Sequence, residues 1–168
     1  FIASHDVLTQ LPNRRLFFDR VTQALELAKR KDTQLALLFI DLDRFKPIND
    51  NWGHAVGDLL LQALAERLTN CVRAADTVGR LGGDEFVVLL PEVTNEEGAI
   101  RVAEGILESL RQPFSVADMT LDISASIGIA LFPQHGRDAV ELVRHADEAM
   151  YRAKEGGQDR FTLFAYPN

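Results

Sequence analysis

Four acidic side chains lie at two points of the sequence where they could hold a metal ion. Asp41 and Asp43 follow an apolar run, and Asp84 and Glu85 follow two consecutive glycines. If the glycine segment is a hairpin turn beside the first strand, the carboxylates meet at one edge of a sheet. Oxygen ligands suit Mg²⁺, and a metal held there could stabilise charge when a hydroxyl attacks a phosphate. Each pair alone is more simply explained as a solvated loop or an ordinary turn; only together do they indicate a metal site.

Three predicted strands and a hairpin turn would position these acids. Residues 35–40 are apolar without helical gaps, which is typical of a central strand covered on both sides. Residues 77–81 and 86–90 flank the segment 82–85, a strong hairpin signal that predicts an exposed turn. A fourth strand, half-buried, is predicted at residues 121–131, which are apolar at odd positions and mostly small or polar at even ones.

Helical periodicity predicts four helices. The first covers residues 14–30 with Asn13 as its N-cap, and the second runs from about Val56 to Leu68 after a polar loop at 49–53. The third opens with a capping box at 94–97. The last covers 139–154 and is stopped by two glycines, after which residues 160–164 can form a closing strand.

The order of these elements indicates one domain over residues 1–168 with a βαββαβ core. We expect an α/β (α+β) fold in which helices pack on one side of a mixed sheet. The chain starts at Phe1 and not at Met, so we expect a fragment of a longer protein.

Composition narrows the class of ligand and the cellular setting. A formal net charge of -7 argues against polymeric nucleic acid. Mg²⁺ can nevertheless neutralise carboxylates and the phosphates of a mononucleotide together. The single cysteine, Cys71, has no disulfide partner, and the longest apolar run is far too short to span a bilayer. We therefore expect a cytoplasmic domain without membrane contact of its own, in a parent protein that could still be membrane-anchored.

Four separated motifs resemble those of one known family. They are Leu8-Thr9-x-Leu11-Pro12-Asn13-Arg14; Asp41-x-Asp43-x-Phe45-Lys46-x-Ile48-Asn49-Asp50 with Gly53-His54-x-x-Gly57-Asp58; Arg80-Leu81-Gly82-Gly83-Asp84-Glu85-Phe86; and His145-Ala146-Asp147-x-Ala149-Met150-Tyr151-x-Ala153-Lys154. The third contains the letters that name the GGDEF family, and all four follow the family's order over nearly the whole chain. The sequence therefore resembles a GGDEF domain.

This resemblance implies a palm-like fold similar to nucleotidyl cyclase catalytic domains and a Mg²⁺-dependent diguanylate cyclase, with Mn²⁺ as the alternative ion. Such an enzyme joins two GTP into cyclic di-GMP and releases two pyrophosphates. Asp41 and Asp84 would hold the metal with the backbone carbonyl of Leu42. Glu85 would bind a second metal or help to deprotonate the attacking 3′-hydroxyl. Because the product has two-fold symmetry, we expect an antiparallel homodimer for catalysis, although an isolated fragment can be monomeric.

The resemblance also assigns contacts to the nucleotide. Asn49 and Asp58 would recognise guanine, since a carboxylate accepts from guanine N1-H and N2-H; the alternative for Asp58 is a helix N-terminal acid. Backbone N–H groups in the turn that includes Phe45 and Lys46 would bind the β- and γ-phosphates. Lys154 would reach the same phosphates, and its alternative role is to interact with the helix C-terminal dipole.

Arg73 and Asp76 stand at the spacing of the family's inhibitory site for cyclic di-GMP, where an arginine fork can hold phosphate and stack on guanine. Their alternative is a solvated surface pair. The chain departs from the family pattern at Gln158, where a basic residue is common, and at Gln10, where glycine is usual. We expect weaker triphosphate binding from the first departure and only a change of loop conformation from the second.

Two other functions stay open. The domain could be a catalytically weak module that binds GTP or cyclic di-GMP and regulates an adjacent domain such as an EAL phosphodiesterase, an alternative that Gln158 favours. A cyclase that uses ATP or forms a mixed product would require that Asp58 fail to discriminate between the bases.

Overall fold

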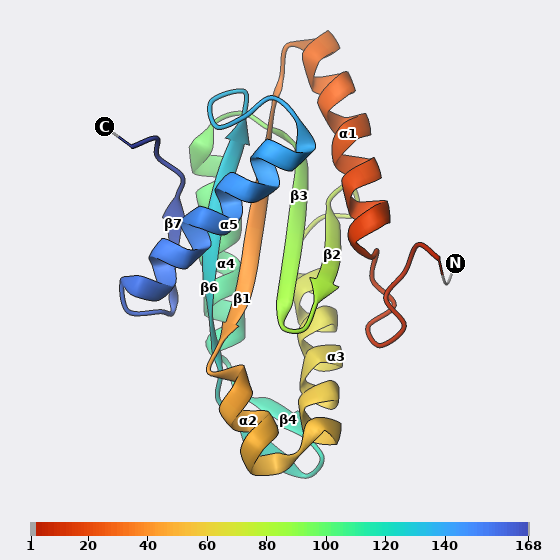
Figure 1. The fold of residues 1–168 in the computed structure, drawn as a ribbon, viewed down its shortest axis with the longest axis vertical. Helices are drawn as coiled ribbons and strands as arrows, with labels where there is room; N and C mark the ends of the chain where they lie inside the picture. The colour runs from red at the N-terminus through yellow and green to blue at the C-terminus, as the bar shows by residue number, and fades with distance from the viewer. Residues whose placement is uncertain (1–2, 168) are drawn as a thin grey trace.

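A mixed five-stranded sheet forms the centre of the molecule. The computed structural model describes residues 3–167, and the strands follow the spatial order β2-β3-β1-β6-β7 (Figure 1). Their bounds are Gln34–Asp43 for β1, Thr77–Gly82 for β2, Glu85–Val93 for β3, Ser124–Phe132 for β6 and Arg160–Leu163 for β7. β1 pairs antiparallel with both β3 and β6, whereas β7 runs parallel to β6. The expected mixed sheet and its central first strand are therefore confirmed.

Helices cover both faces of this sheet. α1 (Arg14–Lys31) and α5 (Ala139–Glu155) pack on one face, and α3 (His54–Asn70) and α4 (Glu96–Arg111) pack on the other. In Figure 1, α5 lies in front of the strands and α4 behind them. Successive side chains of β1 enter the two cores in turn, because strand side chains alternate between faces. The expectation of helices on one side only was wrong, since the central strands are apolar on both faces and need cover on each.

The strand β6 is buried on both faces and not half-buried as its alternating pattern predicts. The even positions Ser126 and Gly128 do not face water: Ser126 is buried with its hydroxyl bonded to Asp43, and α5 crosses closely over Gly128. A Cβ atom added to Gly128 would overlap the carbonyl oxygen of Ala146 and the amide nitrogen of Met150. Gly128 therefore lets α5, which carries Lys154, lie directly against the sheet.

Two elements were not expected from the sequence. The helix α2 (Phe45–Trp52) replaces most of the polar loop expected at 49–53, and none of its residues is fully buried. A separate hairpin is formed by β4 (Phe114–Val116) and β5 (Met119–Leu121), so the long strand expected from residue 121 starts only at Ser124.

The sequence predicted two N-caps and one C-terminal stop for the helices, and the structure confirms two of these three predictions. Asn13 is the N-cap of α1, and its side chain accepts a hydrogen bond from the Leu16 N–H. The last helix ends directly before Gly156, as expected. The third helix differs, because Asn95 and not Thr94 is its N-cap. Asparagine supplies the same kind of acceptor one residue later.

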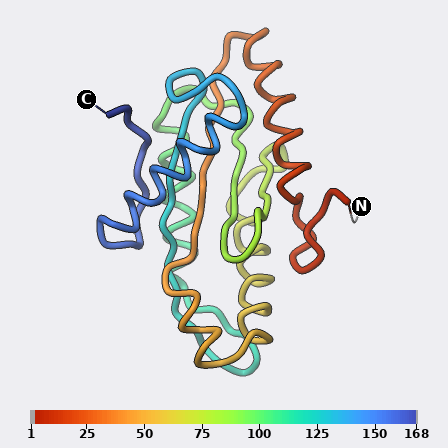
Figure 2. Tube along the Cα trace, viewed as in Figure 1, coloured from red at the N-terminus to blue at the C-terminus, as the bar shows by residue number. Residues whose placement is uncertain are grey.

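The segment before α1 lies along the β2 edge of the sheet, opposite the β7 edge where the chain finishes (Figure 2). Asp6 accepts hydrogen bonds from the backbone and hydroxyl of Thr9 and from Arg80. Gln10 has a φ of 62°, a conformation that favours glycine, so its departure from the family pattern concerns the backbone of this loop. No helix within residues 3–167 is long and apolar enough to cross a lipid bilayer.

Candidate active site

Strand pairing brings three of the predicted acids together. Asp41 pairs directly with Glu85 across β1 and β3, and the Leu42 N–H donates to the Asp84 carbonyl over 3.4 Å. The turn between β2 and β3 therefore lies beside the end of β1 (Figure 1). Asp84 and Glu85 are partly buried, so the expectation of a fully exposed turn was wrong for these two side chains.

Asp41 has the most perturbed environment of these acids. Its side chain is 18% exposed, and Oδ1 is buried without a hydrogen-bond donor among the described residues. Burial first, and then the neighbouring Asp84 carboxylate, raise the pKa of Asp41 to about 8, against the opposing charge of Lys154. Asp41 and Asp84 can share a hydrogen bond only if one of them holds a proton. Without that proton, the pair requires a cation.

Asp43 does not join this pair, although the sequence grouped it with the other acids. Its side chain is 2% exposed and accepts hydrogen bonds from the hydroxyls of Ser124 and Ser126, at 2.6 and 2.7 Å, and from the Asp159 N–H at 2.9 Å. Burial alone would raise its pKa, but these hydrogen bonds and that from Lys154 together hold the pKa below its usual value. Asp43 is thus charged at neutral pH, and its hydrogen bonds leave it little capacity for a metal.

Lys154 extends from the last turn of α5 to the end of β1. Its Nζ lies 3.2 Å from the Leu42 carbonyl oxygen, 3.2 Å from Asp43 Oδ1 and 3.8 Å from Asp41 Oδ2. A lysine that only complemented the helix dipole would not need these partners on another element. The ammonium group therefore belongs to the same cluster as the acids.

The residues present fit a magnesium ion that is bound together with a phosphate. Within residues 3–167, no three His, Cys, Asp or Glu side chains are grouped so that they could hold a metal by themselves. Mg²⁺, however, commonly binds through one or two carboxylates, with water and substrate phosphates completing its shell. The orphaned Asp41 Oδ1, the adjacent Asp84 and the Leu42 carbonyl supply such a partial set.

Glu85 is suited to accept a proton. It lies next to Asp41 in the strand pairing and is partly buried. Burial raises its pKa most, the negative charges of Asp147 and Asp84 raise it further, and Arg14 opposes them. A carboxylate whose pKa is raised is a stronger base than an exposed one, which matches the requirement for deprotonating a hydroxyl.

Arg80 fixes the turn that carries these acids, a role that the sequence analysis missed. Its guanidinium donates to the Gly83 carbonyl at 3.0 and 2.8 Å and to both carboxylate oxygens of Asp6 at 3.0 Å. Gly82 and Gly83 have φ values of 146° and 50°, which favour glycine in this tight turn. The only sequence signal was the position of Arg80 two residues before Gly82.

The predicted guanine-binding residues lie on two helices that are in contact, α2 and α3. Asn49 of α2 packs against Gly57 of α3, where an added Cβ would overlap the amide oxygen of Asn49. The next residue, Asp58, is exposed. It lies beyond the first turn of α3, so the helix dipole alone offers little reason for an acid there.

The predicted phosphate-binding turn is the N-terminus of α2. Arg44 is the N-cap with a φ of 58° and provides no side-chain cap, so the first N–H groups of the helix, including those of Phe45 and Lys46, have no capping side chain. Helix N-termini attract anions through such groups. Gln158 lies in the loop after α5, where its carbonyl accepts from Arg160 Nε at 3.0 Å.

Arg73 and Asp76 lie at a different place, before the start of β2. The Asp76 side chain is 2% exposed and accepts from the Arg73 N–H, whereas the Arg73 side chain is 71% exposed. Asp76 Oδ1 has no partner among the described residues. A cavity of about 260 Å³ adjoins them and is also lined by Arg20, which the sequence analysis did not identify. The full length of β2 separates Arg73 and Asp76 from the turn that carries Asp84 and Glu85. At the usual rise per strand residue, the cavity lies roughly 20 Å from those acids.

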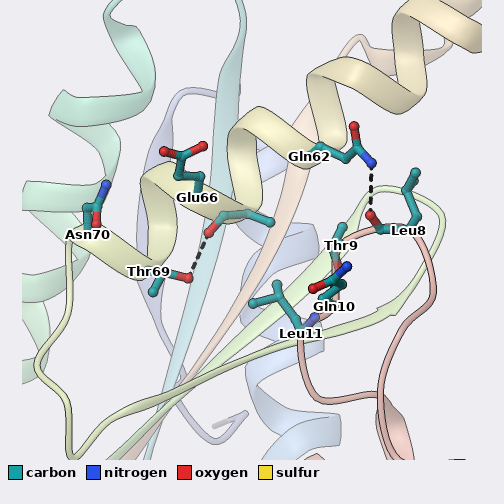
Figure 3. A pocket seen from close by; sticks show the side chains of 9 residues that line it. Leu8, Thr9, Gln10, Leu11, Gln62, Glu66, Thr69 and Asn70 are labelled. Atoms are coloured by element: carbon teal, nitrogen blue, oxygen red, sulfur yellow. Dashed lines mark hydrogen bonds between the residues drawn. The ribbon is translucent and has the colours of Figure 1, made fainter. Parts of the chain in front are cut away.

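Another cavity, of about 350 Å³, lies between the N-terminal segment and α3 (Figure 3). Gln62 donates to the Leu8 carbonyl across it, and Thr69 bonds back to its own helix. Among the described residues that line it, Glu66 is the one with an ionisable side chain. It therefore lacks the convergent charged groups found at the end of β1.

Comparisons with known proteins agree with the motifs. The sequence model of the family described as "Diguanylate cyclase, GGDEF domain" matches residues 3–160. The chain is 48% identical over 163 residues to the bifunctional diguanylate cyclase/cyclic di-GMP phosphodiesterase MucR of Pseudomonas aeruginosa, covering 97% of this chain and 24% of MucR. It is also 48% identical over 153 residues to the diguanylate cyclase TpbB of that organism, covering 90% of this chain and 35% of TpbB. The chain thus spans well under half the length of either relative.

Solved structures show the same fold. The GGDEF domain of TpbB superimposes with a TM-score of 0.94 at 45% identity, covering 96% of this chain and 94% of that one. DgcB from Caulobacter crescentus, solved in complex with c-di-GMP, gives a TM-score of 0.86 at 29% identity, covering 96% of this chain and 85% of that one. On the strength of a family match over most of its length, the chain belongs to the GGDEF domain family of diguanylate cyclases.

Proposed function

We propose that the domain condenses two GTP molecules into cyclic di-GMP and releases two pyrophosphates. The observation that carries this proposal is the partly buried pair of Asp41 and Asp84, whose mutual repulsion requires a proton or a cation. Membership of the GGDEF family supplies the reaction class. The proposed metal is Mg²⁺, with Mn²⁺ as the alternative, held by Asp41, Asp84 and the Leu42 carbonyl.

A metal bound at these oxygens would supply positive charge to stabilise the charge that develops on the reacting phosphate. The residues of the chain accept the proton and bind the phosphates and the base. Glu85 accepts the proton of the 3′-hydroxyl, whose oxygen forms a bond to an α-phosphorus as the bond to pyrophosphate breaks. The N-terminus of α2 binds the terminal phosphates, while Asn49 and Asp58 orient the base.

Two copies of the domain are needed for the complete reaction. Each binds one GTP, and the 3′-hydroxyl held by one attacks the α-phosphate held by the other. An antiparallel homodimer matches the two-fold symmetry of the product. A monomeric isolated domain would then show a turnover that rises steeply with protein concentration.

The alternative function is a GGDEF module that binds nucleotide and regulates an adjacent domain such as an EAL phosphodiesterase. Two observations favour it: Gln158 stands where a basic residue is common, and the chain matches only 24% of the bifunctional MucR. Such a module would bind GTP or cyclic di-GMP without turnover.

Replacing either acid of the turn tests the catalytic proposal. Glu85→Gln and Asp84→Asn should each reduce cyclic di-GMP formation from GTP and Mg²⁺ by at least about a hundredfold, because a base or a metal ligand is lost. Product is measured by chromatography, and circular dichroism checks the fold. Asp19→Asn, which removes an exposed charge on α1, is the matched control and should keep wild-type activity. Full activity of Glu85→Gln would show that Glu85 is not the base. An inactive wild type would favour the regulatory module.

The guanine preference is tested by Asp58→Ala. The substitution removes charge-assisted hydrogen bonds to guanine, so GTP affinity should fall by about tenfold to a hundredfold, corresponding to roughly 1.5 to 3 kcal/mol. ATP affinity should hardly change. Calorimetry with both nucleotides measures this, and Glu66→Ala on the same helix is the control. Equal losses for the two nucleotides would show that Asp58 is structural.

Product inhibition through Arg73 and Asp76 is part of the same proposal. The exposed Arg73, the unpartnered Asp76 Oδ1 and the adjacent Arg20 form a pocket able to bind phosphate and guanine. Arg73→Ala should weaken cyclic di-GMP binding by at least about tenfold and leave GTP binding nearly unchanged. Calorimetry compares the wild type, Arg73→Ala and the exposed control Arg101→Ala. Unchanged cyclic di-GMP affinity in Arg73→Ala would show that Arg73 and Asp76 are only a solvated surface pair.

A further inference from the structure

The ammonium group of Lys154 sits where a cation would be expected to bind. Its Nζ lies 3.2 Å from the Leu42 carbonyl oxygen and 3.2 Å from Asp43 Oδ1, with Asp41 Oδ2 at 3.8 Å. All three groups belong to the end of β1. The side chain is largely enclosed, so the charge is not simply a surface charge screened by water.

Two of these three groups are also ligands in the proposed metal site. The Leu42 carbonyl and Asp41 would hold Mg²⁺, yet Lys154 already donates to the first and pairs with the second. An ammonium group and a divalent metal repel each other strongly at such separations. Lys154 lies near Asp41 Oδ2 and not near the unpartnered Oδ1, so the competition is electrostatic: a metal bound to the Leu42 carbonyl and Asp41 is opposed by the ammonium charge as long as Lys154 stays in place.

We propose that Lys154 acts as an internal cation which occupies this position in the nucleotide-free domain and has to withdraw before a divalent metal can bind. The inference rests on the metal site of the proposed function. It adds that the metal and Lys154 compete for the Leu42 carbonyl and Asp41.

Asp43 explains how Lys154 can withdraw without leaving the site. The Asp43 carboxylate is fixed by Ser124, Ser126 and the Asp159 N–H, none of which depends on Lys154. Lys154 can keep its contact with Asp43 and turn its ammonium group away from Leu42. A triphosphate arriving with the metal then offers the displaced ammonium a new anionic partner.

This exchange couples metal binding to nucleotide binding. Metal alone has to displace Lys154 without compensation, whereas metal with GTP replaces the lost contacts by contacts to phosphate. Each ligand should therefore increase the affinity for the other. In the absence of nucleotide, Lys154 offsets part of the negative charge of Asp41.

The test is the affinity of the nucleotide-free domain for Mn²⁺, measured by electron paramagnetic resonance of the free ion. Lys154→Met keeps an apolar stem of similar length but removes the charge and the donor. It should bind Mn²⁺ about tenfold more tightly than the wild type. Lys154→Gln, which also lacks the charge, is a second variant in case the first is unstable and should bind more tightly too.

The matched control is Arg14→Met. Arg14 also places a positive charge near Glu85 but does not contact the Leu42 carbonyl or Asp41. If direct competition matters, Arg14→Met should change Mn²⁺ affinity by less than about twofold. An equal gain in both variants, or no gain in either lysine variant, would overturn the proposal.

Adding Asp41→Asn to Lys154→Met separates this inference from the proposed function. The double variant should lose the gain in Mn²⁺ affinity, because the freed ligand set is broken. If the gain persists, the metal lies elsewhere and the metal site of the proposed function fails as well. If the wild type makes cyclic di-GMP but Lys154→Met binds Mn²⁺ no more tightly, only the competition by Lys154 is refuted.

Discussion

The properties of the candidate active site follow from the repulsion between two carboxylates, those of Asp41 and Asp84, at the end of the central strand. Burial deprives Asp41 of water, and the neighbouring charge raises its pKa to about 8. Since this value lies above the ordinary 3.8, the protonated carboxyl favours the folded state. Its contribution to stability is present at low pH and is lost as the pH rises toward the folded pKa. Near neutral pH the Asp41 carboxyl of the metal-free domain is therefore mostly protonated, and a metal ion that binds there has to displace this proton.

The rest of the fold holds this unfavourable pair in place. β1 is covered by helices on both faces, so Asp41 cannot turn away into solvent without disturbing the end of a buried strand. Arg80 fixes the opposite side by binding the Gly83 carbonyl and Asp6. Lys154 reaches the pair because Gly128 in β6 allows α5 to lie close to the sheet. Core packing thus stabilises a local arrangement that electrostatics alone would separate.

Sequence patterns predicted the elements whose signals are local. The apolar run before Asp41, the glycine hairpin and the cap at Asn13 all follow from short-range rules, and the structure confirms them. Small residues in β6 were misinterpreted, because a close helix and exposure to water both favour them. The helix α2 was missed since none of its residues is fully buried.

The site was predictable in composition but not in its internal roles. Asp41 and Asp43 have the same residue type and face, yet one lacks a partner at Oδ1 and the other is saturated by two serines, a backbone amide and Lys154. The partners of Asp43 come from β6, from α5 and from the loop after α5, and each lies more than eighty residues from Asp43 along the sequence. The contacts of Arg80 and Arg20 likewise depend on tertiary packing, which no motif encodes.

The repulsion between Asp41 and Asp84 is tested most directly by a carbon-13 NMR titration of the Asp41 carboxyl in the metal-free domain. We expect a titration midpoint of about 8, which falls when Asp84→Asn removes the neighbouring charge. A midpoint near the ordinary value of 3.8 in the wild type would contradict it, because the two carboxylates would then coexist without requiring a proton or a cation.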